Sequence, residues 1–167
     1  MKSLEIKKFN ESVLRSKCEE VEKITPEIKK LVLNMEEIMK KNQGIGLAAN
    51  QVGILKRIIV AQLNLRSSKT TVLINPKIIR RSKEKETREE GCLSFPNIYL
   101  DIKRTKEIIV EALDVNNRKI KIKAKGLGAR VFQHEIDHLN GITFLNKLNF
   151  FGKLKLKLKH PLLRIWI

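Results

Sequence analysis

The segment from Gly126 to Leu139 constrains the fold more than any other part of the chain. It has a helical period and carries two histidines four residues apart, His134 and His138. On an α-helix, residues i and i+4 lie on one face about one turn apart, so both imidazoles can bind one metal ion. Glu135 places a carboxylate beside the first imidazole, where it can reach a water at the same ion. The alternative is a surface helix with two unrelated histidines. We predict a metal site, which makes this helix the centre of the fold.

Most of the sequence before this helix has the period-two alternation or the β-branched runs that are typical of strands. Residues 115–118 are expected to form a hairpin turn, and Ser94-Phe95-Pro96-Asn97 to interrupt the strand pattern. Residues 44–53, which are rich in glycine and alanine, are expected to form a loop. Strands are predicted at residues 56–63, 70–80, 87–93, 98–102, 107–114 and 119–125.

An N-terminal helix is predicted to begin at Thr25-Pro26-Glu27, with threonine as the N-cap and proline at the first helical position. Apolar residues then recur at helical spacing until Asn42-Gln43-Gly44 ends the helix. A chain of 167 residues with 42% hydrophobic residues suits one core. We therefore predict an α+β fold in which antiparallel strands pack around a central metal-binding helix, with an N-terminal helix. A single domain is expected over residues 1–167.

The sequence has no long apolar run and no secretory signal. It therefore predicts no membrane partner and a cytoplasmic location; an organellar protein that has lost its targeting segment fits the sequence as well.

The charge of the chain is strongly basic, with 35 Lys and Arg against 18 Asp and Glu and a net charge of +17. No acidic residue follows His138, and the C-terminal tail at about 149–167 is rich in lysine. Such a field favours polyanions, and we expect the tail to dock on the ribosome. A general lysine bias that keeps the protein soluble is the alternative. No aromatic-rich motif indicates a sequence-specific reader of nucleic acid. The alternation of Lys153 to Lys159 favours a strand, but its leucines also fit a helix.

A catalytic zinc-like site usually has three protein ligands and one position for water. A classical zinc peptidase would take its third ligand downstream, where His160 is the only candidate. We therefore look upstream, where Cys92 lies in Glu90-Gly91-Cys92-Leu93-Ser94 at the end of a predicted strand. The alternative for a free cysteine is a small buried residue, which is the role we expect for Cys18.

Three segments, in this order, resemble the signature motifs of the peptide deformylases. They are Gly44-Ile45-Gly46-Leu47-Ala48-Ala49-Asn50-Gln51, Glu90-Gly91-Cys92-Leu93-Ser94 and Gln133-His134-Glu135-Ile136-Asp137-His138, and the similarity runs from about residue 4 to 148. The resemblance implies a hydrolase that removes the formyl group from the N-terminal formyl-methionine of nascent polypeptides. It also implies one divalent metal on Cys92, His134 and His138, natively Fe(II), with zinc, nickel or cobalt also able to bind.

The same resemblance implies roles for further residues. Glu135 would be the general base, and the Gln51 amide and the Leu93 backbone N–H would stabilise the oxyanion. Ile45, Gly46 and Gly91 would bind the substrate backbone, and Leu127 would line the methionine pocket with Val131. Residues expected to brace the metal ligands are Glu90, Arg104, Gln133 and Asp137.

Three positions depart from the common family pattern: Gln43, Tyr99 and Asn146. None is a metal ligand or the base, so they put substrate affinity and loop packing in question rather than the reaction. A rival function is a non-enzymatic module that binds RNA or the ribosome through the basic tail. The presence of all three ligand candidates and Glu135 argues against it.

Overall fold

The computed structural model describes residues 4–63 and 69–159. The helical elements are η1 (Ser12–Arg15), α1 (Pro26–Lys41), η2 (Ala49–Val52), α2 (Gly126–Leu139), η3 (Phe144–Lys147) and α3 (Phe150–Lys159), of which the η elements are 3₁₀ turns. The strands are β1 (Gly46–Ala48), β2 (Ile58–Ala61), β3 (Thr71–Arg81), β4 (Lys85–Cys92), β5 (Phe95–Thr105), β6 (Glu107–Leu113) and β7 (Lys119–Lys125).

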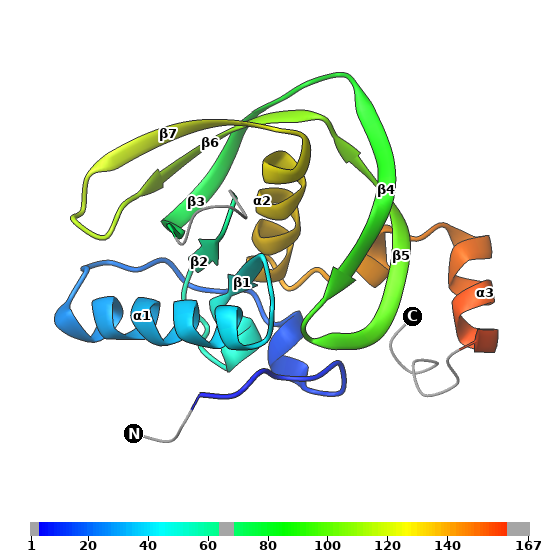
Figure 1. Cartoon of the computed structure of the whole chain (residues 1–167), viewed down its shortest axis with the longest axis horizontal. Helices are drawn as coiled ribbons and strands as arrows, with labels where there is room; N and C mark the ends of the chain where they lie inside the picture. The colour runs from blue at the N-terminus through cyan, green and yellow to red at the C-terminus, as the bar shows by residue number, and fades with distance from the viewer. Residues whose placement is uncertain (1–3, 64–68, 160–167) are drawn as a thin grey trace.

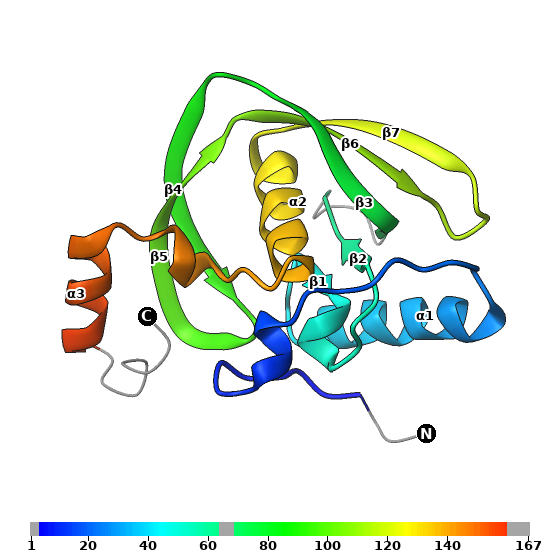
Figure 2. The same cartoon turned by 180° about the vertical axis from the view of Figure 1, so that it is seen from behind.

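Helix α2 lies at the centre of the molecule (Figure 1). A five-stranded sheet in the order β1-β2-β3-β6-β7 lies on one side of it, and the two-stranded β4–β5 hairpin lies on the other. Figure 2 shows the same enclosure from behind. Every strand pair named here is antiparallel. The predicted α+β fold, with antiparallel strands around a central helix and an N-terminal helix, is confirmed.

Strand β2 shows why the two helices flank the larger sheet. All four of its residues are buried, and they alternate between two apolar clusters. Ile59 joins the cluster that contains Phe132 of α2, whereas Val60 joins the cluster that contains Met35 of α1. Because successive strand residues point to opposite faces, β2 is covered by a helix on each side. The core therefore holds α2 firmly against the sheet.

The bounds of both predicted helices agree with the structure. Helix α1 begins at Pro26 and ends at Lys41, and α2 spans the predicted Gly126–Leu139. The predicted hairpin turn at 115–118 is also present, and Asp114 Oδ1 accepts hydrogen bonds from the backbone of Asn116 and Arg118.

Two expectations about irregular segments need correction. Residues 44–53 contain β1 and η2 rather than only a loop, because Gly46 to Ala48 pair with β2. The break expected at 94–97 is present but shorter: the chain reverses at Leu93 and Ser94, and β5 already begins at Phe95. Pro96 is compatible with this strand because β4–β5 is a two-stranded ribbon with free edges. In the tail, residues 150–159 form a helix.

Among the described residues, no helix combines the length and the apolar character that a membrane span requires.

Candidate metal centre and active site

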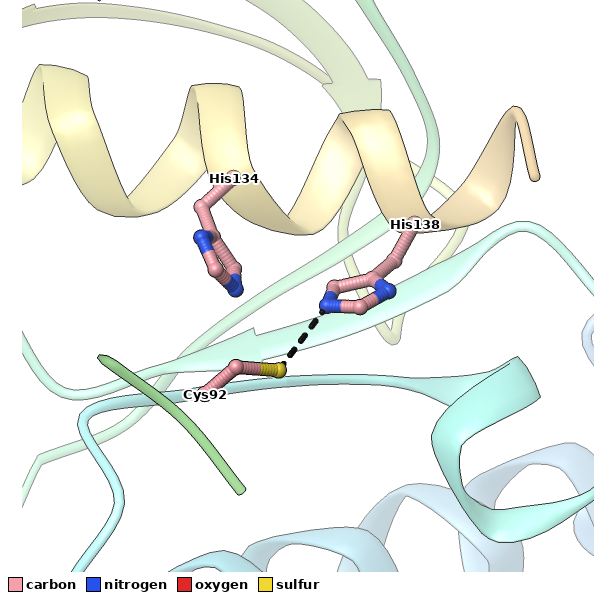
Figure 3. A group of neighbouring side chains, drawn as sticks. All are labelled: Cys92, His134 and His138. Carbon is pink, nitrogen blue, oxygen red and sulfur yellow. Dashed lines mark hydrogen bonds between the residues drawn. The ribbon is translucent and has the colours of Figure 1, made fainter. Parts of the chain in front are cut away.

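Cys92, His134 and His138 converge at the point where β4 ends against α2. Their ligand atoms all lie within 4.8 Å of one another. Figure 3 shows both imidazoles projecting from α2 towards the Cys92 side chain. The Cys92 Sγ lies 3.2 Å from His138 Nε2. Within the part of the chain that the structure describes, this is the only group of three or more such residues that could hold a metal ion.

The ionisation of the two histidines fits a cation site. Burial lowers the pKa of His138 well below its ordinary value, so this imidazole is neutral, the form that binds metals. Burial also acts to lower the pKa of His134, but Cys92 and Glu90 outweigh it and raise the pKa to about 10. Cys92 and Glu90 thus make this cluster favour a positive charge. A divalent cation bound between the thiolate and the imidazoles would supply that charge.

Glu90 fixes the orientation of His134. Its Oε2 accepts a hydrogen bond from His134 Nδ1 at 2.9 Å, which leaves Nε2 for the metal cluster. Arg104 binds both Glu90 oxygens, through Nε at 2.8 Å and Nη2 at 2.9 Å. Burial alone would raise the pKa of Glu90, but its hydrogen bonds to Arg104 and His134 lower it to about 2. Glu90 is therefore a permanent carboxylate that holds His134 in one tautomer.

Glu135 is buried beside β1 and faces the cleft. A Cβ atom on residue 46 would overlap with Glu135 Oε1, and it would lie only 2.9 Å from Glu135 Cδ. Glycine at position 46 is thus what makes room for the carboxylate. The Glu135 Oε2 atom is buried without a hydrogen-bond partner, and burial raises the pKa of Glu135 to about 7. Such a carboxylate can take up a proton near neutral pH.

The Gln51 side chain points its amide donor towards the cluster. Its Oε1 accepts the Ala48 backbone N–H at 2.8 Å, which fixes the amide orientation. Its Nε2 then lies 3.4 Å from Cys92 Sγ and 3.2 Å from Ser94 Oγ. Gln51 is thus a fixed neutral donor next to the metal cluster.

The cleft next to the cluster contains most of the predicted substrate-binding residues. Gly91 also lines it, and the exposed Tyr99 ring packs on Gly91: a Cβ on residue 91 would be 2.9 Å from Tyr99 Cε1. Leu127 is not among the lining residues, and 43% of it is exposed at the start of α2. The predicted residues that do line the cleft are Ile45, Gly46, Gln51, Gly91, Cys92, Leu93, His134 and Glu135.

The residues expected to brace the ligands differ in what they contact. Arg104 joins Glu90 to Asp137, and Asp137 also pairs with Lys147. Asp137 therefore reaches His134 only through two intervening side chains. Gln133 contacts neither histidine.

The Gln133 amide instead anchors α2 to the end of β5. It donates to Thr105 O at 2.9 Å and accepts from Thr105 Oγ1 at 2.9 Å.

Sequence analysis missed three residues that contact this site. Asn50 is buried and donates to His138 O at 2.6 Å, Ser94 lies beside the Gln51 amide, and Arg130 binds Glu90 at 2.6 Å. Asn50 and Ser94 fall inside the quoted motifs, so their position gave a signal that was not used. His160, the ligand candidate of the peptidase alternative, lies outside the described residues.

Comparisons with known proteins agree with this site. The family model for polypeptide deformylase matches residues 3–153. The peptide deformylase of Thermodesulfovibrio yellowstonii is 46% identical over 151 residues, covering 89% of this chain and 91% of the relative. That of Desulforudis audaxviator is 40% identical over 155 residues, covering 93% of this chain and 99% of the relative.

Solved structures give the same result. A peptide deformylase from Synechococcus elongatus in complex with actinonin has a TM-score of 0.88 at 40% identity, covering 92% of this chain and 84% of that one. Peptide deformylase from Thermotoga maritima has a TM-score of 0.84 at 38% identity, covering 89% and 99%. With its fold, its metal cluster and its motifs all in agreement, this chain belongs to the polypeptide deformylase family.

Proposed function

We propose that this protein is a metal-dependent hydrolase that removes the N-formyl group from the N-terminal formyl-methionine of newly synthesised polypeptides. The observation that carries the proposal is the convergence of Cys92, His134 and His138 beside the Glu135 carboxylate, whose Oε2 has no hydrogen-bond partner. Residues 1–167 would form one catalytic domain, acting in the cytoplasm where nascent chains emerge.

Cys92, His134 and His138 would hold one divalent metal, with Fe(II) as the native ion. A thiolate with two imidazoles also suits zinc, nickel or cobalt. When bound, such a cation supplies Lewis acidity to the attacking water and to the formyl oxygen. The neutral state of His138 and the buried Glu90 behind His134 support this donor set.

Glu135 would act as the general base. Its Oε2 has no hydrogen-bond partner, so it is free to take the proton of the attacking water and pass it to the departing amine. The pKa of about 7 suits both steps, since the group then exchanges protons readily near neutral pH.

Gln51 and Leu93 would stabilise the oxyanion of the tetrahedral intermediate. The Gln51 amide is held in place by Ala48, so it needs no reorganisation when negative charge develops. Leu93 would contribute its backbone N–H from the tight turn after Cys92.

The substrate would lie along the cleft as an added strand. Ile45, Gly46 and Gly91 would offer backbone groups to it, and the close approach of a peptide explains the two glycines. The methionine side chain would contact Ile45 and His134, which line the cleft. The actinonin bound to the Synechococcus elongatus relative supports a ligand-binding cleft in this fold.

The test is a formate-release assay on protein purified anaerobically and loaded with Fe(II) or Ni(II). A formyl-Met peptide should be hydrolysed, whereas the same peptide with an acetyl cap should not. Cys92→Ser should lose both metal and activity. Metal-loaded protein that releases no formate would refute the proposal.

We also propose that the basic tail at 149–167 brings the enzyme to the ribosome. Helix α3 lies outside β5 at one edge of the molecule (Figure 1), packs through Leu156 on the body and has an acid-free sequence. Its Phe150, Phe151 and Leu158 are exposed, which offers an apolar surface next to lysines. Full-length protein should co-sediment with ribosomes, and a chain truncated after residue 148 should not. Equal co-sedimentation of the two would reject the idea.

A further inference from the structure

Arg130 is a buried arginine on the same face of α2 as the two histidines. Residues 130, 134 and 138 are at positions i, i+4 and i+8, so the helix places them in one row. Only 7% of Arg130 is exposed. A guanidinium taken out of water is tolerated only where its donors have partners, so its contacts reveal what it holds.

The Arg130 guanidinium binds both strands of the β4–β5 hairpin. Its Nη2 donates to Glu86 O of β4 at 2.9 Å, and its Nη1 donates to Ile102 O of β5 at 2.8 Å. The same Nη1 donates to Glu90 Oε1 at 2.6 Å. Nη1 also donates to Arg88 O at 3.4 Å, so one side chain of the helix contacts four acceptors on the hairpin.

These contacts lie between the two elements that supply the metal ligands. Arg130 is one helical turn before His134, and Glu90 is two residues before Cys92. Glu90 is the shared partner, because its Oε1 accepts from Arg130 and its Oε2 accepts from His134. A shift of Arg130 would therefore change both the spacing of hairpin and helix and the orientation of the His134 ring.

Glu90 has two guanidinium partners, Arg104 and Arg130. The carboxylates of Glu90 and Asp137 face the guanidiniums of Arg104 and Arg130. Without Arg130, the hairpin carbonyls of Glu86, Arg88 and Ile102 would lose a buried donor. Glu90 would keep Arg104, and the His134–Glu90 hydrogen bond between α2 and β4 would remain.

We propose that Arg130 is a positioning residue for the metal centre: it sets the distance between the Cys92 strand and the histidine helix and fixes the carboxylate that orients His134. This inference rests on the proposed metal site of Cys92, His134 and His138. Arg130 touches neither substrate nor metal in this scheme, so its effect should appear in metal retention and ligand geometry.

The test compares Arg130→Met and Arg130→Lys with the wild type, all loaded with Co(II). Three quantities are measured: the rate of Co(II) loss to a chelator, the visible absorption of the bound Co(II), and the thermal melting of the fold. Arg88→Met is the matched control, since it removes one arginine charge from the hairpin that Arg130 contacts. The Arg88 side chain is 60% exposed and pairs only with Glu86 on the surface.

We expect Arg130→Met to lose Co(II) roughly tenfold faster or more, with a changed absorption spectrum. Arg130→Lys should give a rate and a spectrum between those of Arg130→Met and the wild type, because a lysine keeps the charge but cannot reach all four acceptors. Arg88→Met should match the wild type. A lower melting temperature of Arg130→Met with a wild-type rate and spectrum would overturn the inference.

If Arg130→Met does not fold, the rate of Co(II) loss and the absorption spectrum of Arg130→Lys test the inference. Wild-type values of that rate and that spectrum would overturn it. The proposed metal site fails in a different way: the wild type would take up no Co(II), or Cys92→Ser would bind it equally well.

Discussion

Gly46 and Glu135 occupy adjoining space that admits no side chain at position 46: a Cβ there would overlap with the Glu135 carboxylate and lie 2.9 Å from Val131 Cγ1. Side chains of helix α2 therefore pack directly against the backbone of strand β1 at Gly46. This contact fixes where the carboxylate stands relative to the metal cluster.

Gly46→Ala should lower kcat/KM by about 100-fold, because displacing the base by about 1 Å has costs of this order. Metal content should stay close to that of the wild type, since the atoms nearest to a Cβ on residue 46 belong to Glu135 and Val131 and not to a metal ligand. The measurement is formate release together with metal analysis. Gly128→Ala is the control: its Cβ would meet only ordinary contacts of 3.7 Å and more, so activity should not change.

Glu135→Gln should retain the metal and lose turnover, with a fall in kcat of about 100- to 10,000-fold. The amide keeps the shape of the carboxylate but cannot accept the proton of the attacking water. Metal analysis and kcat are measured on the same preparation. If the variant loses its metal, Glu135 has a role in binding the ion and the assignment as base is wrong.

His160→Ala should keep the metal content and the activity of the wild type. The three ligands found here come from β4 and α2, so no third histidine is needed. Metal analysis before and after dialysis gives the answer, and loss of the ion would favour the peptidase arrangement in which His160 is the third ligand.

The parts of this molecule that were predicted from sequence are those set by local spacing. The bounds of α2 and the shared face of its two histidines follow from the helical period alone. Cys92 was found because the sequence after His138 offers no acidic ligand. The tertiary structure decided the rest: glycine and alanine in β1 have little strand preference, and only pairing with β2 makes that segment a strand.

Arg130 is a residue of the site whose role also depends on tertiary contacts and could not be predicted from local spacing. A single arginine on a helix looks like an ordinary surface residue until the β4–β5 hairpin is placed over it. Gln133 was expected near the ligands because it adjoins His134, but consecutive helix residues point about 100° apart, and its amide binds Thr105 instead.

The two cysteines should differ sharply in reactivity. With metal bound, neither thiol should react quickly with a disulfide reagent. After chelation Cys92 should react, because it lines the open cleft, while Cys18 stays protected since only 3% of it is exposed. Mass spectrometry of the labelled peptides identifies the site. Rapid labelling of Cys92 in the metal-loaded protein would argue against its role as a ligand.

The Cys18 thiol should also make stability depend on pH in the alkaline range. Burial raises the pKa of Cys18 from 9.0 to about 11, so the folded protein holds the thiol proton more tightly than the unfolded chain. This contribution to stability is complete below pH 9 and is lost as the pH rises towards 11, because the unfolded chain then gains by ionising.

The full difference corresponds to about 3 kcal/mol. Urea unfolding of the wild type and of Cys18→Ala at a series of pH values measures it. Their difference in free energy of unfolding should shrink between pH 9 and 11, while the lysines titrate alike in both proteins. A constant difference across that range would show that the thiol ionises equally in both states.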